Sequence, residues 1–407
     1  MRVVVTSESR FSRTRDGAVW VEAGPDNAIW RRYLVAFDSV RVAARVRDVA
    51  RRPAAAARVD GDGVEVWALP YYVGPRGYLL GRRAIAAAVS AAAEPTDAVV
   101  LRVPSPIGSL LARARDRARL PYALEVIGDP YDVLAPGVVR HPLRPLLRMV
   151  STRTLRRQCR AAAAVAYETE RRLQLRYPTL PTTPTAGISS VDLPPAAFVP
   201  RARPVRQLPP VATLVSVGSL EQLYKGIDTL VSALALMPAD GPRARLVHVG
   251  TGVYRPHLEQ LADRSGVADR VTFTGPLPDA EAVRRQLDSA DLFVMPSRTE
   301  GLPRALIEAM ARALPAVGST AGGIPELLEP DCLVPPDDPA ALASTVTAML
   351  ADPDRLAAAS ARNLRRARGF SAETLDARRA SFYRTVAEFT AAGRAGRRTP
   401  APLPSAR

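Results

Sequence analysis

The sequence predicts an α/β protein built from two doubly wound domains with parallel sheets that face a cleft. Short runs of β-branched residues alternate with helix-like stretches in both halves of the 407-residue chain, as they do in parallel βαβ units. A proline-rich tract without periodicity, residues 192–210, lies between the halves and is typical of an interdomain linker. Folds of this class bind ligands at the carboxyl ends of their strands, so the cleft is the expected site.

The expected N-terminal domain comprises residues 1–195. Its strands are expected at 2–7, 39–46, 64–70, 97–103, 122–128 and 162–167. Helix-like stretches lie between several of these strands, at 78–92, 107–119 and 143–160. Because helices connect the strands, neighbouring strands are expected to be parallel.

The expected C-terminal domain comprises residues 196–370, and its strands are mostly apolar throughout rather than alternating, as in a parallel sheet covered on both faces. We expect these strands at 211–218, 244–250, 270–275, 290–297 and 314–320. Helices are expected at 226–237, 255–265, 279–288, 303–313, 339–351 and 353–366. A long helix at 371–391 is expected to pack back across the domains, and the basic tail 392–407 is expected to be disordered.

The composition, 47% hydrophobic and 24% charged, is that of a soluble globular protein. No apolar run is long enough to span a bilayer, and the N-terminus has no apolar signal core. Cys159 and Cys332 have no metal-ligand spacing, so we expect reduced thiols in a cytoplasmic protein. Asp60 and Asp62 have the spacing of a metal-binding pair, but Asp-Gly steps beside a strand favour a turn. No metal and no cofactor is expected.

The formal net charge of +16 indicates an anionic partner or a compositional drift toward arginine. Residues 133–167 contain no acid and seven arginines: Arg140, Arg144, Arg148, Arg153, Arg156, Arg157 and Arg160. Leucines lie among them, which is the pattern of a basic amphipathic helix. We predict that this segment contacts an anionic membrane surface, and an ordinary solvated face is the alternative. Few aromatic residues and dispersed arginines argue against nucleic acid.

The segment 295–329, "MPSRTEGLPRALIEAMARALPAVGSTAGGIPELLE", carries the strongest chemical signal. A buried strand is followed by a loop with Glu300 and Gly301, and Pro303 is expected at the first position of a helix. Free backbone N–H groups at this helix start, those of Leu302 and Arg304, suit a phosphate. Glu308 lies within the helix among apolar residues and needs a partner. The alternative is that Glu308 caps a neighbouring loop and Glu300 is merely exposed.

This segment resembles the glutamate-x7-glutamate signature of the retaining glycosyltransferases of family 4, which have the GT-B fold. The resemblance implies that Glu300 contacts the hydroxyls of the donor sugar and that Glu308 contacts the ribose of the nucleotide. The "GGIPELL" stretch, residues 322–328, matches the continuation of the family motif. The N-terminal half matches less closely and resembles a branch of the family associated with cell-surface polysaccharides.

The chain contains one lysine, Lys225, among 56 Lys and Arg residues. The stretch 217–237 resembles the family motif in which a lysine contacts the donor diphosphate after a strand that ends in glycine, here Gly218. An ammonium is a compact charge with three rotatable donors, unlike a guanidinium, which would explain its retention. The family commonly has arginine at the position of Ser219, so one diphosphate cation is missing, and Arg304 is a candidate to replace it.

Three further glycines, Gly250, Gly252 and Gly275, complete the resemblance and are expected to line the donor site. Many family members have a histidine after the fifth strand of the N-terminal domain, where this chain has Asp129. This aspartate either orients a substrate or caps the next element.

The resemblance implies a cytoplasmic, metal-independent retaining glycosyltransferase that moves a sugar from a nucleotide-sugar donor to a glycan or lipid-linked acceptor. The enzyme is expected to lie free or at the inner face of the cell membrane. Lys225, Glu300 and Asp129 are the expected catalytic residues. Two alternatives are a nucleotide-sugar epimerase or hydrolase on the same fold, and a non-catalytic basic protein that binds anionic lipid.

Overall fold

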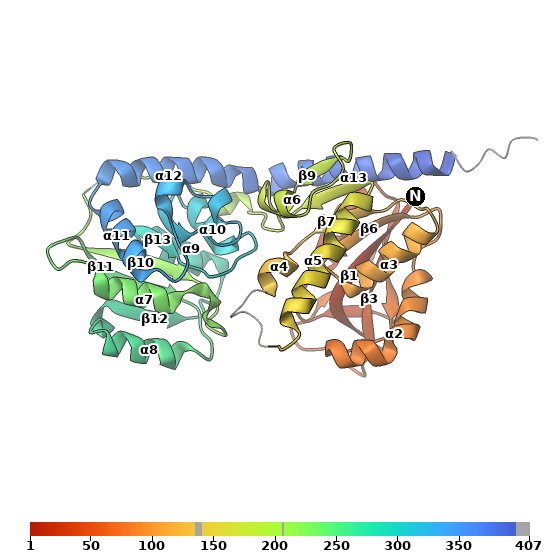
Figure 1. Cartoon of the computed structure of the whole chain (residues 1–407), viewed down its shortest axis with the longest axis horizontal. Coiled ribbons are helices and arrows are strands. Elements are labelled where there is room, and N and C mark those ends of the chain that lie inside the picture. The colour runs from red at the N-terminus through yellow and green to blue at the C-terminus, as the bar shows by residue number, and fades with distance from the viewer. Residues whose placement is uncertain (135–140, 206, 396–407) are drawn as a thin grey trace, which may run out of the picture. The chain divides into compact units, whose positions relative to one another are not determined.

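The computed structural model describes residues 1–134, 141–205 and 207–395 of the chain, which divide into two compact units (Figure 1). Of these residues, the N-terminal unit contains 1–134, 141–188 and 376–395, and the C-terminal unit contains 189–205 and 207–375. Each unit is a parallel sheet covered by helices. Among the described residues, none of the helices is both long and apolar enough to cross a membrane.

The sheet of the N-terminal unit has seven parallel strands in the order β5-β3-β1-β6-β7-β8-β9. In chain order they are β1 (Arg2–Arg13), β3 (Ser39–Asp48), β5 (Val64–Leu69), β6 (Ala98–Val103), β7 (Ala123–Val126), β8 (Ala164–Tyr167) and β9 (Thr185–Gly187). Two short antiparallel strands, β2 (Val19–Val21) and β4 (Ala57–Arg58), extend it. The strands β2, β4 and β9 are too short to show a periodic pattern, so the sequence does not predict them.

The two faces of this sheet carry separate cores because successive side chains of a strand point to opposite sides. Val4 belongs to the core under α2 (Gly74–Ser90), α3 (Pro106–Arg117) and α5 (Arg144–Ala161). Val3 belongs to the opposite core, together with Trp30 of α1 (Asn27–Arg31) and Val386 of α13 (Ala372–Ala395). The remaining helical segments of the unit are short: η1 (Arg32–Val35), α4 (Pro130–Val133) and α6 (Arg172–Arg176).

The sheet of the C-terminal unit has six parallel strands in the order β12-β11-β10-β13-β14-β15. They are β10 (Val211–Val217), β11 (Arg243–Val249), β12 (Val271–Gly275), β13 (Leu292–Met295), β14 (Ala316–Ser319) and β15 (Leu333–Val334). The strand order reverses between β10 and β13. In doubly wound sheets this topological switch point is where ligands bind.

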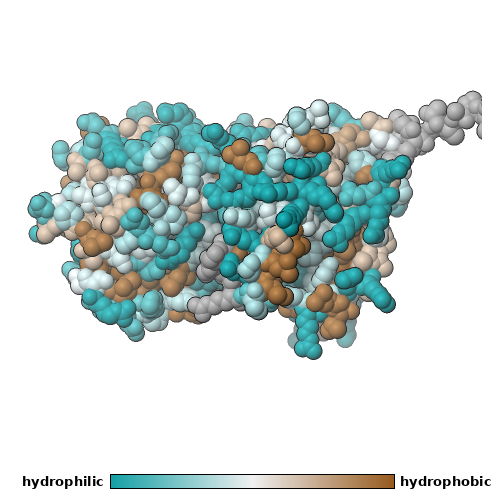
Figure 2. Space-filling model, viewed as in Figure 1, coloured by the Kyte–Doolittle hydropathy of each residue, from teal (hydrophilic) through white to brown (hydrophobic). Residues whose placement is uncertain are grey.

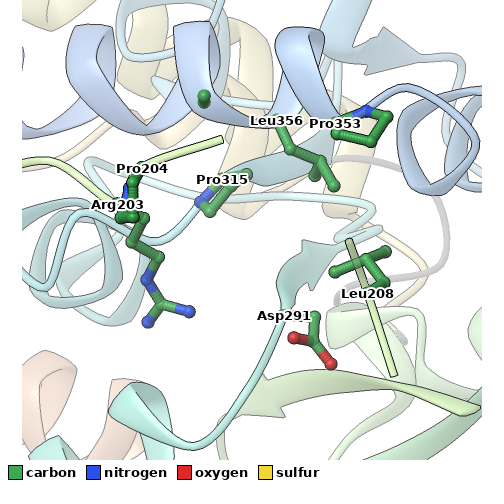
Figure 3. Close-up of a pocket in the computed structure, with 8 residues that line it drawn as sticks. Arg203, Pro204, Leu208, Asp291, Pro315, Pro353 and Leu356 are labelled. Atoms are coloured by element: carbon green, nitrogen blue, oxygen red, sulfur yellow. The ribbon is translucent and has the colours of Figure 1, made fainter. Parts of the chain in front are cut away.

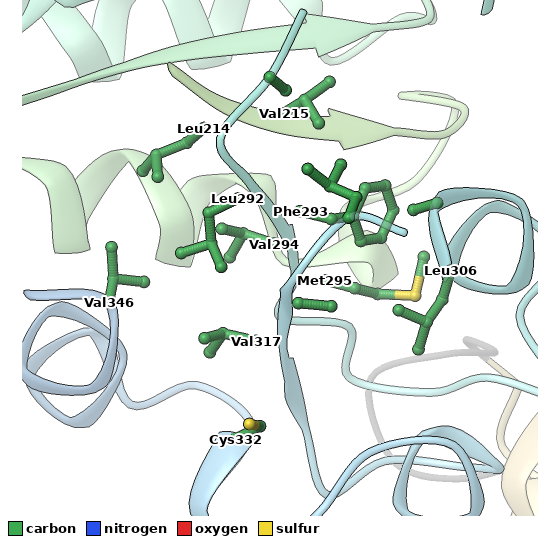
Figure 4. Close-up of a cluster of buried hydrophobic side chains, with 14 of the residues drawn as sticks. Leu214, Val215, Leu292, Phe293, Val294, Met295, Leu306, Val317, Cys332 and Val346 are labelled. Atoms are coloured by element: carbon green, nitrogen blue, oxygen red, sulfur yellow. The ribbon is translucent and has the colours of Figure 1, made fainter. Parts of the chain in front are cut away.

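Two groups of helices cover this second sheet. The first group is α7 (Ile227–Leu236), α8 (Arg255–Arg264) and α11 (Pro339–Leu350), and the second is α9 (Ala280–Asp288), α10 (Arg304–Ala311) and α12 (Pro353–Ala367). Figure 4 shows the core on both sides of the sheet, with Leu214 and Val346 on one side and Phe293 and Leu306 on the other. Residues 212–216 of β10 are all buried, so both faces of the sheet are covered.

The proline-rich tract is not a free linker. The boundary between the units falls between residues 188 and 189, and most of the tract packs on the C-terminal unit. The backbone of Leu193 exchanges hydrogen bonds of 2.9 Å with Phe370 and Ala372, and Val199 N–H donates to the carbonyl of Ala311 at 3.1 Å. Proline suits such a segment because the segment uses few backbone N–H donors and proline has none.

The last helix also differs from expectation. α13 runs to Ala395 rather than residue 391, and residues 396–407 of the expected tail lie outside the described residues.

Candidate active site

Two loops of the C-terminal unit meet at its topological switch point. One follows β10 and contains Lys225, and the other follows β13 and contains Glu300. The two strands are neighbours, with Val215 paired to Phe293, so the loops leave the same edge of the sheet. Residues that are 75 positions apart in the sequence therefore lie together.

Lys225 and Glu300 form a direct ion pair. The ammonium Nζ of Lys225 donates to Oε1 of Glu300 at 2.6 Å, and the hydroxyl of Ser297 donates to the same oxygen at 2.8 Å. The side chains are 17% and 9% exposed, so the pair is largely shielded from water. The cation expected to meet a diphosphate and the carboxylate expected to meet a sugar are thus in one place.

The loop that carries Lys225 is fixed by a glycine and by an arginine. Gly226 has φ +68°, and a Cβ there would lie 2.1 Å from the carbonyl oxygen of Pro296, so only glycine allows this contact. Arg298 donates through two nitrogens to Asp228 at 2.8 and 2.9 Å, and also to the carbonyl of Leu223. The hydrogen bonds to Asp228 raise the pKa of Arg298 above its ordinary value.

The loop that carries Glu300 is fixed from the next strand. The hydroxyl of Ser319, at the end of β14, donates to the carbonyl of Ser297 at 2.5 Å. Gly323 N–H donates to the carbonyl of Gly301 at 2.8 Å. A Cβ on Gly322 would lie 1.9 Å from the carbonyl oxygen of Glu300, so the glycine pair supports the loop by close backbone contact.

Helix α10 begins beside this loop and has no side-chain cap. Pro303 occupies the N-cap position and Arg304 is the first helical residue, one position later than expected. Its free N–H groups carry the positive end of the helix dipole. Leu302, just before the cap, is buried.

Glu308 lies on the second turn of α10, and its side chain is 30% exposed. Burial raises the pKa of Glu308, while Arg304 and Arg284 act in the opposite direction. The guanidinium of Arg304 is 3.9 Å from Oε1 of Glu308, which is long for an ion pair, and it is 56% exposed. The side chain of Arg304 thus lies beside Glu308, and its expected contact with a diphosphate stays a prediction.

The remaining predicted glycines join the loops after β10, β11 and β12. Gly218 N–H donates to the carbonyl of Val249, and Gly250 N–H donates to the carbonyl of Gly275, both at 3.0 Å. Gly252 lies against the backbone of Leu220, to which a Cβ would approach within 2.1 Å.

Ser219, where the family commonly has arginine, is exposed. Its hydroxyl accepts the N–H of Glu221 at 3.2 Å, so it turns the loop locally.

A buried histidine supports this edge of the sheet. His248 of β11 is fully buried, and its Nε2 lies 3.1 Å from the carbonyl of Gly218. This contact requires a proton on Nε2, because a carbonyl only accepts. Burial lowers the pKa of His248 to about 4, so the neutral ring holds the loop after β10. Nothing in the sequence of the strand around His248 predicts this supporting role.

Asp129, in the N-terminal unit, is the N-cap residue of α4 and is 7% exposed. Its Oδ1 accepts from the N–H of Tyr131 at 2.9 Å and from the hydroxyl of Tyr177 at 2.5 Å, while Arg176 donates to Oδ2. These contacts match the second of the two expected roles of Asp129, in which it caps the next element. A catalytic role for Asp129 stays a prediction.

A small cavity of about 20 Å³ lies elsewhere in the C-terminal unit (Figure 3). It is lined by prolines and leucines together with Arg203 and Asp291, at the opposite edge of the sheet from Lys225. Its volume holds about one water molecule, which excludes a nucleotide sugar. Over the described residues, no three His, Cys, Asp or Glu side chains are grouped as metal ligands.

Comparisons with known proteins bear on the fold and on the class of enzyme. Residues 211–352 match the family described as glycosyl transferases group 1. The matched residues include the loops of Lys225 and Glu300 and helix α10 with Glu308. The chain is 26% identical to Protein CapJ of Staphylococcus aureus over 316 residues, which cover 77% of this chain and 78% of that protein. The chain is a GT-B glycosyltransferase.

Other relatives of this glycosyltransferase match over shorter stretches. The colanic acid biosynthesis glycosyltransferase WcaL of Escherichia coli, described as putative, is 36% identical over 165 residues, or 38% of this chain and 40% of WcaL. A GDP-mannose-dependent phosphatidylinositol monomannoside mannosyltransferase of Mycobacterium tuberculosis is 41% identical over 112 residues, or 26% of this chain and 29% of that enzyme.

Solved structures show the same fold across nearly the whole glycosyltransferase. The sucrose-phosphate synthase of Thermosynechococcus elongatus covers 96% of this chain and 100% of its own, with a TM-score of 0.65 and 20% identity. HepE of Anabaena, solved with UDP and glucose, covers the same shares with a TM-score of 0.59 and 18% identity. The predicted GT-B fold with two parallel sheets is therefore confirmed.

Proposed function

We propose that this glycosyltransferase moves a sugar from a nucleotide-sugar donor to a glycan or lipid-linked acceptor, with retention at the anomeric carbon. The product would belong to a cell-surface polysaccharide or glycoconjugate. Relatives named for colanic acid and phosphatidylinositol mannoside synthesis support this class of acceptor. Solved relatives with UDP or UDP-glucose support the class of donor.

The observation that carries the proposal is the Lys225–Glu300 pair at the switch point, beside the uncapped start of α10. A donor diphosphate brings negative charge that competes for the ammonium of Lys225. Once Lys225 turns to the phosphate, Oε1 of Glu300 is free to accept a sugar hydroxyl. Glu308, on the same helix, is the proposed acceptor for the ribose hydroxyls.

The chemistry requires charge stabilisation more than a strong protein base. As the glycosidic bond to the diphosphate breaks, the sugar gains oxocarbenium character and the leaving phosphate gains negative charge. The ammonium of Lys225, once it has turned to the diphosphate, and the helix N–H groups at the start of α10 stabilise that charge. The resemblance implies that the departing phosphate oxygen takes the proton of the acceptor hydroxyl.

A donor screen tests the proposal. UDP-glucose, UDP-galactose and GDP-mannose are each added to the protein, and binding is measured by calorimetry. At least one should bind, and binding should be lost in Glu308→Ala. Failure of the whole panel to bind, or unchanged binding in the variant, would contradict the assigned site.

Turnover without an acceptor distinguishes the alternatives. A bound donor incubated alone should remain intact, whereas an epimerised or hydrolysed product would favour the rival enzyme classes. Transfer in the presence of a metal chelator should proceed at an unchanged rate. The anomeric configuration of the product, determined by NMR, tests retention.

We further propose that the enzyme acts at an anionic membrane surface through the segment 140–160. Arg140 lies outside the described residues. Arg144 and Arg148 do not form a free stripe, because they donate to the carbonyls of Leu134 and Tyr131 at 3.2 and 2.7 Å. The exposed arginines of the helix are Arg153, Arg156, Arg157 and Arg160.

A further inference from the structure

Helix α2 of the N-terminal unit presents apolar side chains to solvent. Leu79 and Leu80 are 63% and 81% exposed, and Val73, just before the helix, is 58% exposed. The exposed arginines Arg76, Arg82 and Arg83 surround them, and residues 71–93 contain no acid. A soluble helix normally turns its leucines inward, as α2 does with Ile85 and Val89. The outward pair is therefore a second apolar face.

Helix α5 shows the same combination. Leu146 and Leu147, near its start, are 50% and 43% exposed, and Met149 and Val150 are 41% and 50% exposed. Its inward side is formed by Leu155 and other buried residues. The exposed arginines follow in its second half. Leucines and arginines on an outer face without acids are the composition of helices that lie in a membrane interface.

The two exposed faces belong to one side of the N-terminal unit. α2, α3 and α5 all pack on the same core, and α3 contacts both of the others. α2 follows β5 and α5 comes after β7, so both helices begin at the carboxyl edge of the parallel sheet. Figure 2 shows brown apolar groups bordered by teal hydrophilic groups on this side.

We propose that the outer faces of α2 and α5 form one docking surface for a bilayer that contains anionic phospholipid. The leucines enter the interface, and the arginines meet lipid phosphates. The charge of the two helices favours an anionic bilayer as the partner, because they carry arginines and no compensating acid. Each basic residue near an anionic surface adds to the attraction. Helix α2 thus adds a second membrane contact to the segment 140–160 of the proposed function. This docking surface rests on the proposed function only in that a lipid-linked acceptor would bring the enzyme to the membrane.

Vesicle flotation tests the surface. The full chain is mixed with vesicles of phosphatidylcholine alone or with phosphatidylglycerol added. Binding should require phosphatidylglycerol and weaken at high salt. The double variants Leu79→Asp/Leu80→Asp and Leu146→Asp/Leu147→Asp should each reduce partitioning by about tenfold or more, since they remove apolar groups and add repulsive charge.

The control is Leu236→Asp on α7 of the C-terminal unit, where the leucine is 55% exposed, and it should bind vesicles like the wild type. Wild-type binding by the α2 variant would overturn the two-helix surface. A monomer–dimer equilibrium in sedimentation that both variants abolish, without vesicle binding, would assign the surface to a second copy instead.

Calorimetry with UDP and GDP separates this inference from the proposed function. Variants that lose vesicle binding but keep the wild-type nucleotide affinity support the docking surface. The proposed nucleotide site lies in the C-terminal unit, so the fold of the substituted N-terminal unit is checked by denaturant unfolding followed through the tryptophans, all three of which lie in that unit. Loss of its cooperative unfolding transition would mean misfolding. The double variant Arg76→Gln/Arg83→Gln leaves the leucines in place and tests the arginines alone. It should bind vesicles more weakly than the wild type, and unchanged vesicle binding would overturn the proposal.

Discussion

At the residue scale, the single lysine of the chain, Lys225, lies in a tight position where a larger cationic side chain would not fit. Lys225 packs over Gly218, where an added Cβ would come within 3.3 Å of the lysine Cε. Its Nζ is also 5.1 Å from the centre of the Tyr224 ring. A guanidinium is flat and larger, so it does not fit the same contacts. In the structure Lys225 and Glu300 neutralise each other, which offsets the cost of shielding either charge alone.

Replacement of Lys225 by Arg should lower kcat/KM by about tenfold or more, because the larger, flat guanidinium would not fit this position and would place the cation away from the leaving phosphate. Steady-state kinetics with the donor found in the screen measures it. The control is the opposite exchange, Arg264→Lys, at an exposed position of α8, and it should leave kcat/KM unchanged. Wild-type rates in the Lys225 variant would remove the explanation for the retained lysine.

Glu308 should make nucleotide binding pH-dependent. Burial raises its pKa, so on acidification it takes up a proton earlier than an ordinary glutamate. Ribose hydroxyls donate to the ionised form, and the affinity should therefore be highest above this raised pKa and fall as the pH decreases through it. Calorimetric titrations at several pH values measure the effect. Glu308→Gln should weaken binding by about tenfold and remove the dependence, whereas Glu281→Gln, an exposed carboxylate on α9, should change neither.

At the element scale, the site depends on loops that touch through their backbones. The loop after β10 rests on the end of β13 at Gly226, and the loop after β13 rests on Gly322 beyond β14. Parallel strands bring these loops to one edge, and the glycines set the distance between them. A change of one Cβ therefore alters the position of Lys225 relative to Glu300.

Gly226→Ala should reduce kcat/KM by about a hundredfold, because the new Cβ would meet the Pro296 carbonyl and displace Lys225. Gly266→Ala is a matched control. Gly266 has φ +66°, almost the same as Gly226, but no atom lies within 4 Å of its added Cβ. The control shares the backbone strain of about 1–2 kcal/mol and lacks the collision. Equal activities in the two variants would show that contact between the loops is unimportant.

Much of this arrangement could be predicted at the level of elements. The strands β10 and β13 are largely apolar on both faces, a pattern that indicates a covered parallel strand, and Glu300 and Glu308 follow β13 at a characteristic spacing. The direct Lys225–Glu300 contact could not be predicted, since it depends on which strands are neighbours. The supporting roles of Ser297 and Ser319 could not be predicted either, because no sequence pattern marks these residues.

Two features of the structure depend on local contacts. The segment 133–167 was expected to contain a basic amphipathic helix, and in the structure Arg144 and Arg148 at the start of α5 donate to carbonyls of the segment that includes α4. The proline-rich tract was expected to connect the domains, but its backbone packs on the C-terminal unit. Both depend on tertiary contacts that periodicity does not contain.

At the scale of the whole molecule, the last helix completes the core of the first unit. Phe382, Tyr383 and Val386 of α13 are buried with residues from the start of the chain. The hydroxyls of Tyr383 and Tyr33 both donate to Glu125, at 3.0 and 2.8 Å, and their rings stack 4.4 Å apart. Burial, with Glu125 nearby, raises the pKa of both tyrosines far above the ordinary value.

Phe382→Ala should lower the free energy of unfolding of the N-terminal unit by about 3–5 kcal/mol through lost burial and a cavity. Tyr383→Phe should cost about 1.5–3 kcal/mol because a hydrogen bond to a carboxylate is lost. The three tryptophans, Trp20, Trp30 and Trp67, all lie in this unit, so their fluorescence during denaturant unfolding reports on it alone. Arg384→Ala, exposed on the same helix, should have little effect.

The N-terminal unit is discontinuous in sequence: its residues 376–395 are reached only after the chain has passed through the entire C-terminal unit. A ribosome therefore releases the last part of the first unit after the second is already made. Gene fusions that exchange one half between relatives must have two seams, near 188 and near 375. A swap with a single seam would combine a core from one parent with the closing helix of the other.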